Sequence, residues 1–149
     1  DKQNILTNFN IQKIIAVKLN QLKQIDNNKF EIKQRNKILL IERKDGEGWC
    51  VPGGNLLLGE SPEITAIRET KEETNTEVKN IKLIGIYSVK DKKGIPKLSI
   101  IYEAKYIRGK LKINHESKNI KWVSVSSRRK NLHLAFGLEK AITDWWNKK

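Results

Sequence analysis

The sequence predicts a mixed α/β fold, and three observations support that prediction. Short apolar runs of strand length recur along the chain, such as residues 38–41. In the middle of the chain Ser61, a side chain suited to an N-cap, precedes Pro62, which suits the first helical position. A second helical segment closes the chain. Strands combined with two helices in this order favour one mixed β-sheet with a helix on each side.

The individual elements follow from apolar periodicity and turn residues, taken in chain order. After a polar lead-in over residues 1–10, strands are expected at 11–19, 30–32, 37–43, 81–88, 98–107 and 121–125. Helices are expected from residue 62 to about residue 75 and over residues 134–146. Turn signals separate these elements at residues 26–29, 45–48, 91–94 and 108–110. The segment 20–36 is longer than a simple link needs, which predicts an extra hairpin.

Length and composition indicate a single domain over residues 1–149, with its core between about residues 11 and 146. A chain of 149 residues buries roughly 70% of its unfolded surface, which is enough for a proper core. No apolar stretch reaches the ~18 residues of a membrane span, so no membrane association is expected. The single Cys50 cannot form an internal disulfide, which is typical of a protein in the reducing cytoplasm.

The net charge of +13 has more than one interpretation. A basic chain can bind nucleic acid, and its field can steer anionic substrates. Lys far outnumbers Arg here, and the lysines are spread over the whole length among abundant Ile and Asn. That distribution favours the compositional bias of an AT-rich genome over a nucleic-acid partner, and an RNA-like partner stays the alternative.

The most informative segment is an array of carboxylates between Gly54 and Thr76. Gly54 is followed after five residues by Glu60, and seven further residues lead to Arg68 and Glu69. From there the chain reads Thr70-Lys71-Glu72-Glu73-Thr74-Asn75-Thr76. The segment just before the array reads Trp49-Cys50-Val51-Pro52-Gly53-Gly54. Its two glycines allow a close approach of the backbone and angles barred to other residues.

On a helical wheel the array separates into two faces. The carboxylates Glu69, Glu72 and Glu73 fall within an arc of about 100°, with Glu73 nearest the core and therefore deepest. The neighbouring, core-facing arc holds Ala66, Ile67, Thr70 and Thr74. Like charges three or four residues apart destabilise a helix by about 0.2–0.5 kcal/mol each. Divalent cations, which prefer oxygen ligands, would offset that repulsion; a solvated surface face is the alternative.

This spacing resembles the signature of the Nudix hydrolases: Gly, five residues, Glu, seven residues, Arg-Glu, an aliphatic residue, any residue, Glu-Glu, any residue, Gly and an aliphatic residue. Six of the seven fixed identities are present. Asn75 replaces the second Gly and can still end the helix in a left-handed turn. Thr70 and Thr76 replace the aliphatic residues, and a Thr hydroxyl can bond back to helix carbonyls. The resemblance implies the Nudix α/β/α sandwich, a mixed sheet with helices on both sides.

The resemblance also implies a functional site. The residues implied to hold Mg²⁺, for which Mn²⁺ can substitute, are Gly53, through its carbonyl, with Glu69, Glu72 and Glu73. The residues assigned to catalysis are Glu60, Arg68, Glu72, Glu73 and Glu116. The residues expected to contact substrate are Trp49, Gly54 and Phe136. Phe136 belongs to a segment, Leu134-Ala135-Phe136, that resembles one common in bacterial Nudix ADP-ribose and nucleoside-triphosphate pyrophosphatases.

Three of these assignments have open alternatives. By resemblance Arg68 pairs with Glu60 and fixes the loop against the helix, whereas an ordinary surface pair with Glu72 is the alternative. Many Nudix enzymes take a further Glu from a loop outside the signature. Glu116, in the loop before the last predicted strand, is the candidate base, and a plain surface carboxylate is its alternative. Trp49 can stack on substrate or belong to the core.

The expected function is magnesium-dependent hydrolysis of a small nucleotide, a nucleoside diphosphate linked to another moiety, of the nucleoside-triphosphate or ADP-ribose and ADP-sugar type. Two other functions stay open. One is a Nudix-fold regulator that binds nucleotide or RNA without turnover, and the other is a pyrophosphohydrolase of RNA 5′ ends. The sequence leaves both a monomer and a homodimer open.

Overall fold

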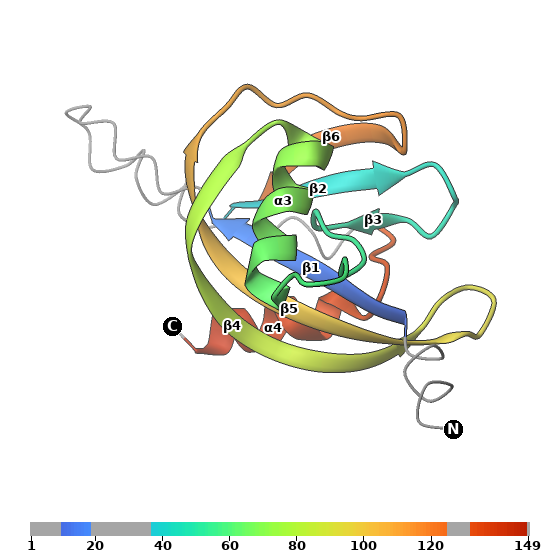
Figure 1. Ribbon diagram of the computed structural model, residues 1–149. Coiled ribbons are helices and arrows are strands. Elements are labelled where there is room, and N and C mark those ends of the chain that lie inside the picture. Colours follow the sequence, from blue (N-terminus) through green and yellow to red (C-terminus); the bar gives the residue numbers. More distant parts are fainter. Residues whose placement is uncertain (1–9, 19–36, 125–131, 149) are drawn as a thin grey trace.

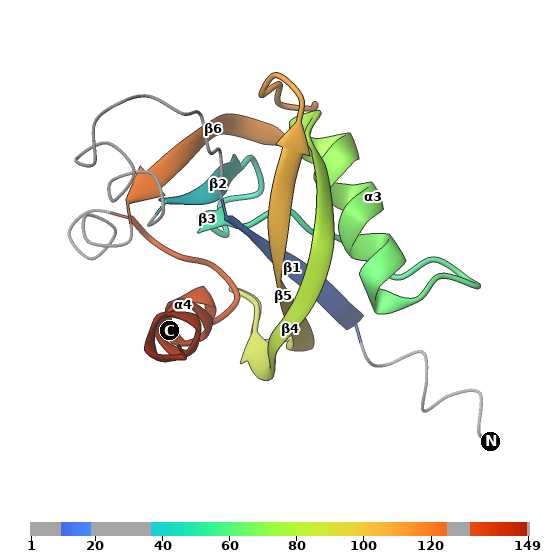
Figure 2. The same cartoon turned by 90° about the vertical axis from the view of Figure 1, so that its left-hand side faces the viewer.

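The computed structural model describes residues 10–18, 37–124 and 132–148, and these contain one six-stranded sheet and two helices (Figure 1). The strands are β1 (Asn10–Lys18), β2 (Lys37–Arg43), β3 (Trp49–Cys50), β4 (Glu77–Lys90), β5 (Pro96–Arg108) and β6 (Ser117–Ser124). The helices are α3 (Pro62–Thr74) and α4 (Leu138–Asn147). Figure 2 shows α3 and α4 on opposite sides of the sheet, which confirms the predicted sandwich.

The sheet is mixed because one of its strand pairs is parallel. Its path runs β3-β2-β1-β5-β4, and β6 pairs with β2 outside that path. Strand β1 runs parallel to β5 from Asn10↔Lys97 to Lys18↔Lys105, whereas the other pairs are antiparallel. A parallel pair needs a long connection, and here that connection carries β2, β3, α3 and β4.

Each helix covers its own apolar cluster. Helix α4 buries one stripe, formed by Leu138, Ala141, Ile142 and Trp145, at the spacing of an amphipathic helix. This stripe packs on a cluster that includes Ile38, Leu40 and Ile101. Helix α3 covers a smaller cluster of Leu39, Ala66, Val78, Tyr102 and Ala104. Strand β2 therefore sends apolar side chains to both sides, which explains why residues 38–41 form an unbroken apolar run.

The predicted last helix begins too early. Residues 133–135 are not helical, because their backbone pairs with Trp49: the Trp49 N–H donates to the His133 carbonyl at 2.8 Å, and the Ala135 N–H donates to the Trp49 carbonyl at 2.8 Å. Phe136 and Gly137 then adopt left-handed φ values of 55° and 66° before α4 starts. Ala135 and Phe136 belong to the same buried cluster as the apolar stripe of α4, so apolar periodicity alone misplaced the start of the helix.

The remaining elements match the predictions with longer strands, except β3 (Trp49–Cys50), which the sequence did not predict. The structure extends the strands predicted at 81–88, 98–107 and 121–125 to the bounds of β4, β5 and β6, with turns between them as expected. The extra hairpin predicted at 20–36, with its turn at 26–29 and strand at 30–32, lies outside the described residues. So do residue 19 and residue 125.

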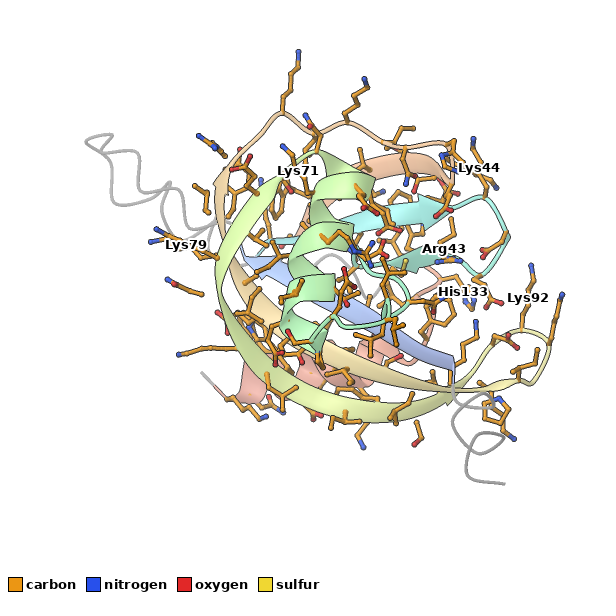
Figure 3. The ribbon with its side chains drawn as sticks, viewed as in Figure 1. Arg43, Lys44, Lys71, Lys79, Lys92 and His133 are labelled. Atoms are coloured by element: carbon orange, nitrogen blue, oxygen red, sulfur yellow. The ribbon has the colours of Figure 1, made fainter. Side chains whose placement is uncertain are left out.

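The basic side chains lie on different sides of the molecule. Figure 3 shows Lys79 on the flank opposite Lys44 and Lys92, and Lys71 near the end of α3. Such a spread agrees with the interpretation of the charge as a compositional bias. Neither of the two described helices is long and apolar enough to cross a membrane.

Candidate active site

Helix α3 begins and ends at the residues whose side chains the sequence marks as caps. The Ser61 hydroxyl accepts the Ile64 N–H at 3.2 Å, and Pro62 occupies the first turn. Asn75 ends the helix in the left-handed region at φ 59°, and its N–H donates to the Lys71 carbonyl at 2.9 Å. These caps fix where the helix sits along the chain, and so fix which residues face the sheet.

The face of α3 that packs on the sheet is built from small and polar residues. Thr65, Ala66, Thr70 and Thr74 are fully buried. The Thr70 hydroxyl donates to the Ala66 carbonyl at 2.8 Å, as the sequence suggested. The Thr74 hydroxyl donates to the Thr70 carbonyl at 2.6 Å, and the Thr76 hydroxyl, for which a helix carbonyl was also expected, lies 2.6 Å from the Thr74 hydroxyl instead. The assignment of Ile67 to this face is wrong: it is 40% exposed, because it lies at the margin of the buried arc.

The three carboxylates of α3 differ in burial. Glu73 is 4% exposed, whereas the side chains of Glu69 and Glu72 are 15% and 56% exposed. The depth predicted for Glu73 is therefore confirmed. Burial raises the pKa of Glu73 to about 8, against the opposing hydrogen bond from Gly53. Burial also raises the pKa of Glu69.

The loop that carries Gly53 and Gly54 runs directly against two of these carboxylates. The Gly53 N–H donates to Glu73 Oε2 at 2.8 Å. A Cβ at position 54 would lie 2.3 Å from both Cδ and Oε1 of Glu69. No side chain fits in that space, so a glycine is needed at position 54 for Glu69 to lie against the backbone.

Arg68 joins the loop to the helix. Its Nε and Nη2 donate to Oε1 and Oε2 of Glu60 at 2.6 and 3.1 Å, which confirms the expected pair. The alternative pair with Glu72 is also present: Nη1 donates to Glu72 at 3.0 Å and to Glu69 at 2.8 Å. Arg68 therefore links the carboxylates to one another, and Glu60 holds Arg68 in place.

Glu60→Gln is expected to remove an acid-sensitive part of the stability. Hydrogen bonds from Arg68 and then from Thr65 lower the pKa of Glu60 from 4.5 to about 2. A carboxylate with a depressed folded-state pKa stabilises the protein above its unfolded pKa and loses that effect as pH falls through the folded value. Thermal unfolding from pH 7 to pH 2 should show a Tm gap between wild type and variant that is full above about pH 4.5 and narrows as the pH falls from there to about 2. A gap independent of pH would contradict the pairing.

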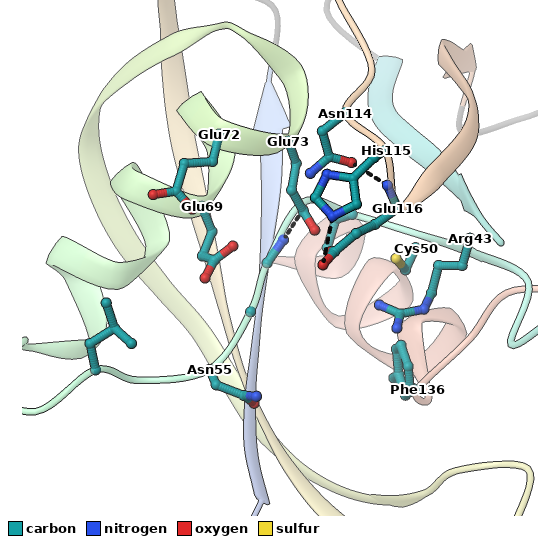
Figure 4. Close-up of a pocket in the computed structure, with 14 residues that line it drawn as sticks. Arg43, Cys50, Asn55, Glu69, Glu72, Glu73, Asn114, His115, Glu116 and Phe136 are labelled. Carbon is teal, nitrogen blue, oxygen red and sulfur yellow. Dashed lines mark hydrogen bonds and ion pairs between the residues drawn. The ribbon is translucent and has the colours of Figure 1, made fainter. Parts of the chain in front are cut away.

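The carboxylates open onto a cavity of about 600 Å³ (Figure 4). Its walls come from the end of β2, the glycine loop, α3, the loop before β6 and the segment before α4. The lining side chains with polar or aromatic character are Arg43, Asn55, Glu69, Glu72, Glu73, Asn114, His115, Glu116 and Phe136. The cavity thus brings together side chains that lie far apart in the sequence.

The structure places most of the predicted site residues at this cavity. Glu116 lines it, on a loop fixed by the Lys44 N–H, which donates to the Glu116 carbonyl at 3.1 Å. Gly53, Gly54 and Phe136 line it as well. Trp49 does not belong to the lining: it packs partly buried against the core, with Lys121 Nζ 4.4 Å from its ring centroid, so its position favours the core assignment.

Sequence reasoning missed Arg43, together with Asn55, Asn114 and His115. Arg43 ends β2 and lines the cavity opposite the helix (Figure 4). The available signal was a charged residue at the end of a strand whose centre, residues 38–41, is apolar. The pairing of β2 with β6 and the path of the glycine loop decide which residues meet there, and neither can be read from local patterns.

The donor set of the cavity suits a hard divalent cation. Carboxylate oxygens and a backbone carbonyl are the ligands that Mg²⁺ prefers. The fit is supported by the close approach of Glu69 to Gly54 and of Glu73 to Gly53. Within the described residues, no group of three or more His, Cys, Asp or Glu side chains forms a ready-made metal site. Glu69 and Glu72 are turned toward Arg68 here.

Comparisons with known proteins agree with this geometry. A family model described as the NUDIX domain matches residues 30–144. The ADP-ribose pyrophosphatase of Methanocaldococcus jannaschii is 37% identical over 120 residues, which are 76% of this chain and 68% of that protein. A MutT-like protein of Streptomyces ambofaciens is 31% identical over 62% of this chain, and the match spans 58% of that relative.

Solved structures share the fold at lower identity. A NUDIX hydrolase from Nitrosomonas europaea superposes with a TM-score of 0.75 and 21% identity, over 95% of this chain and 90% of that one. The NUDIX domain of Shewanella oneidensis NrtR, solved with ADP ribose, gives 0.72 and 18%, over 99% of this chain and 98% of that one. With the family match and the capped, carboxylate-bearing helix, these likenesses establish that the chain belongs to the Nudix hydrolases, enzymes that act on phosphoanhydride bonds.

Proposed function

We propose that this chain is a magnesium-dependent pyrophosphohydrolase of a nucleoside diphosphate linked to a second moiety. The observation that carries the proposal is the contact between the carboxylates of α3 and the glycine loop. Glu73 accepts the Gly53 N–H, and Glu69 lies where only a glycine at position 54 leaves room. This arrangement places two carboxylates against the backbone of residues 53–54, in a cavity large enough for a nucleotide.

We assign the metal to this part of the cavity, with Gly53 (through its carbonyl), Glu69, Glu72 and Glu73 as ligands. When bound, Mg²⁺ would neutralise the charge that develops on the phosphate oxygens and lower the pKa of a water molecule bound to it. Glu60 and Arg68 act as positioning residues, because their contacts hold the loop and orient Glu69 and Glu72. Glu73 is the most buried of these ligands, so it would hold the metal at the deepest point of the cavity.

We assign the general base to Glu116, which lines the cavity from the loop before β6. Its carboxylate takes a proton from the attacking water while the water oxygen forms a bond to one phosphorus. The bond between that phosphorus and the bridging oxygen breaks, and the second phosphate leaves with the electron pair. Positioning and electrostatic stabilisation supply most of the catalysis in such phosphoryl transfers.

The favoured substrate class is ADP-ribose and related ADP-sugars, with nucleoside triphosphates second. The Methanocaldococcus relative is named an ADP-ribose pyrophosphatase and matches over most of this chain, which supports the first class. A cavity of about 600 Å³ has the size of sites that enclose one nucleotide-sized ligand. Phe136 lines that cavity and remains the proposed aromatic contact; for Trp49, which lies outside it, we propose the core role.

The test is a panel of substrates with Mg²⁺, in which released AMP, phosphate and pyrophosphate are measured. The panel holds ADP-ribose, an ADP-sugar, dGTP, ATP and a short RNA with a 5′ triphosphate. Turnover of ADP-ribose or of a nucleoside triphosphate supports the proposal. Preference for the RNA would assign the activity to RNA 5′ ends, and binding of ADP-ribose without hydrolysis would identify a nucleotide-binding regulator.

Removal of divalent cations is expected to abolish turnover. The ligands assigned above are all oxygen atoms, which bind Mg²⁺ and Mn²⁺ well and Zn²⁺ with less preference. Activity measured after dialysis against a chelator should fall to background and return when Mg²⁺ or Mn²⁺ is added in excess. Zn²⁺ serves as the comparison metal. Full turnover in excess chelator would refute the metal assignment.

A further inference from the structure

Arg43 stands out among the residues that line the cavity. Although the chain carries 30 Lys and Arg residues, Arg43 is the only one of either type among the described residues of the lining, which also holds four glutamates. Figure 4 shows its guanidinium beside Phe136, on the side of the cavity away from Glu69 and Glu72. A positive charge at this place can bind the part of an anionic ligand that extends past the carboxylates.

We infer that Arg43 is a substrate-binding residue that donates hydrogen bonds to a phosphate oxygen of the nucleotide. The inference rests on the proposed function and deepens it by naming a residue outside the carboxylate array. The planar fork of a guanidinium matches two phosphate oxygens at once, and charge-assisted bonds of this kind are about twice as strong as neutral ones.

The contacts of Arg43 fix its orientation and leave donors free. Its Nε donates to Oδ2 and Oδ1 of Asp45 at 2.9 and 3.1 Å, and its Nη2 donates to Oδ2 at 2.5 Å. A guanidinium has five N–H groups, and this side-on pair occupies the Nε edge. A side-chain hydrogen bond with Cys50 takes a third donor, which leaves two N–H groups for a further acceptor in the cavity.

Phe136 supports the guanidinium from one face. The Cζ atom of Arg43 lies 5.2 Å from the ring centroid, and Lys97 Nζ lies at the same distance from it. The ring is 5% exposed, and the Phe136 backbone has a φ of 55°, a conformation that costs energy for an aromatic residue. Such strain persists only where the surroundings hold it, so the ring is a fixed support.

The loop that carries Asp45 is held in place by hydrogen bonds from the hairpin between β4 and β5. The Lys92 N–H donates to Oε1 and Oε2 of Glu47 at 3.1 and 3.2 Å, and Lys92 Nζ donates to the Asp45 carbonyl. Figure 3 shows Arg43 and Lys92 on the same flank of the molecule. Arg43 is thus held by contacts from separate segments, which is the preorganisation that substrate recognition requires.

The experiment compares wild type with Arg43→Gln, Arg43→Lys and Lys44→Gln. Lys44 is the matched control, since it is the next residue, carries the same charge and is exposed. Binding of ADP-ribose in excess chelator is measured by titration calorimetry, and KM and kcat are measured with ADP-ribose and dGTP in Mg²⁺. Thermal unfolding of each variant checks that it is folded.

Arg43→Gln is expected to weaken ADP-ribose binding about tenfold, equivalent to about 1.4 kcal/mol, and to raise KM more than it lowers kcat. Arg43→Lys should recover part of the affinity, because it keeps the charge and loses the fork. Lys44→Gln should stay within about twofold of wild type, as surface substitutions do. An effect confined to dGTP would place the contact on the terminal phosphate.

Two failures can be told apart. If no nucleotide is hydrolysed by the wild type but Arg43→Gln weakens ADP-ribose binding, the proposed function fails and the substrate contact stands. If the wild type is active and folded Arg43→Gln matches it in both affinity and KM, the substrate contact is wrong. A wild type that neither binds ADP-ribose nor hydrolyses dGTP overturns both the substrate contact and the proposed function.

Discussion

Glu73→Gln is expected to reduce kcat by about a hundredfold or more, equivalent to about 2.7 kcal/mol of barrier, while the protein stays folded. Glu73 is the most buried carboxylate of the site, and the proposed role makes it the deepest ligand of the cation. The amide keeps the shape of the side chain, and its oxygen can still accept the Gly53 N–H. Steady-state kinetics of the purified variant in Mg²⁺ measure the effect.

Stability separates this result from misfolding. Burying a carboxylate costs free energy that an amide does not incur, so the Tm of Glu73→Gln in excess chelator should equal or exceed that of wild type. Glu139→Gln, an exposed position in the first turn of α4, controls for the loss of one negative charge. Activity of Glu73→Gln within about tenfold of wild type, or about 1.4 kcal/mol of barrier, would rule out the assigned role.

Gly54→Ala is expected to lower kcat/KM by about a hundredfold, because displacement of a catalytic group by about 1 Å has effects of that size. The new Cβ would lie 2.3 Å from Cδ of Glu69, so the carboxylate must swing away. The end of a flexible side chain moves at little cost, so the fold should persist. Kinetics and thermal unfolding of the variant, measured together, separate the two effects.

Gly59 provides the matched control in the same loop. A Cβ there meets nothing within 4 Å, although its φ of 84° makes an alanine strained. Gly59→Ala is therefore expected to lose about 1–2 kcal/mol of stability with activity near that of wild type. Gly54→Ala should show the reverse pattern. If both variants lose stability and keep activity, Glu69 does not depend on the space at position 54.

The parts of the site that the sequence predicted are those fixed by local chemistry. The cap at Ser61, the left-handed stop at Asn75 and the depth of Glu73 follow from side-chain type and helical spacing, and the structure confirms each of them. The pair of Arg68 and Glu60 came from the resemblance, since seven residues of loop and helix lie between them. Local sequence rules therefore predict a helix and its faces, whereas the contact between Arg68 and Glu60 is predicted only by the family motif.

The parts that the sequence did not predict depend on contacts between distant segments. Arg43 became visible as a site residue only once the loops around the cavity were placed. The start of α4 at Leu138 rather than residue 134 results from pairing of residues 133–135 with Trp49, a partner that no local pattern names. The exposure of Ile67 depends on how the helix is rotated about its axis against the sheet. The positions of apolar residues along the helix do not determine that rotation.

The pairing of Trp49 with Leu134 affects the order in which the parts of the protein fold during synthesis. The two residues are about 85 positions apart, and β3, which leads into the glycine loop, has only two residues of its own. When the nascent chain has emerged as far as the end of β5, all the carboxylates of α3 are present. Strand β3, beside the glycine loop, still lacks its partner Leu134 at that stage. We therefore expect the helix and the β4–β5 hairpin to form during synthesis, and the catalytic cleft to be completed only after residues 133–135 have left the ribosome.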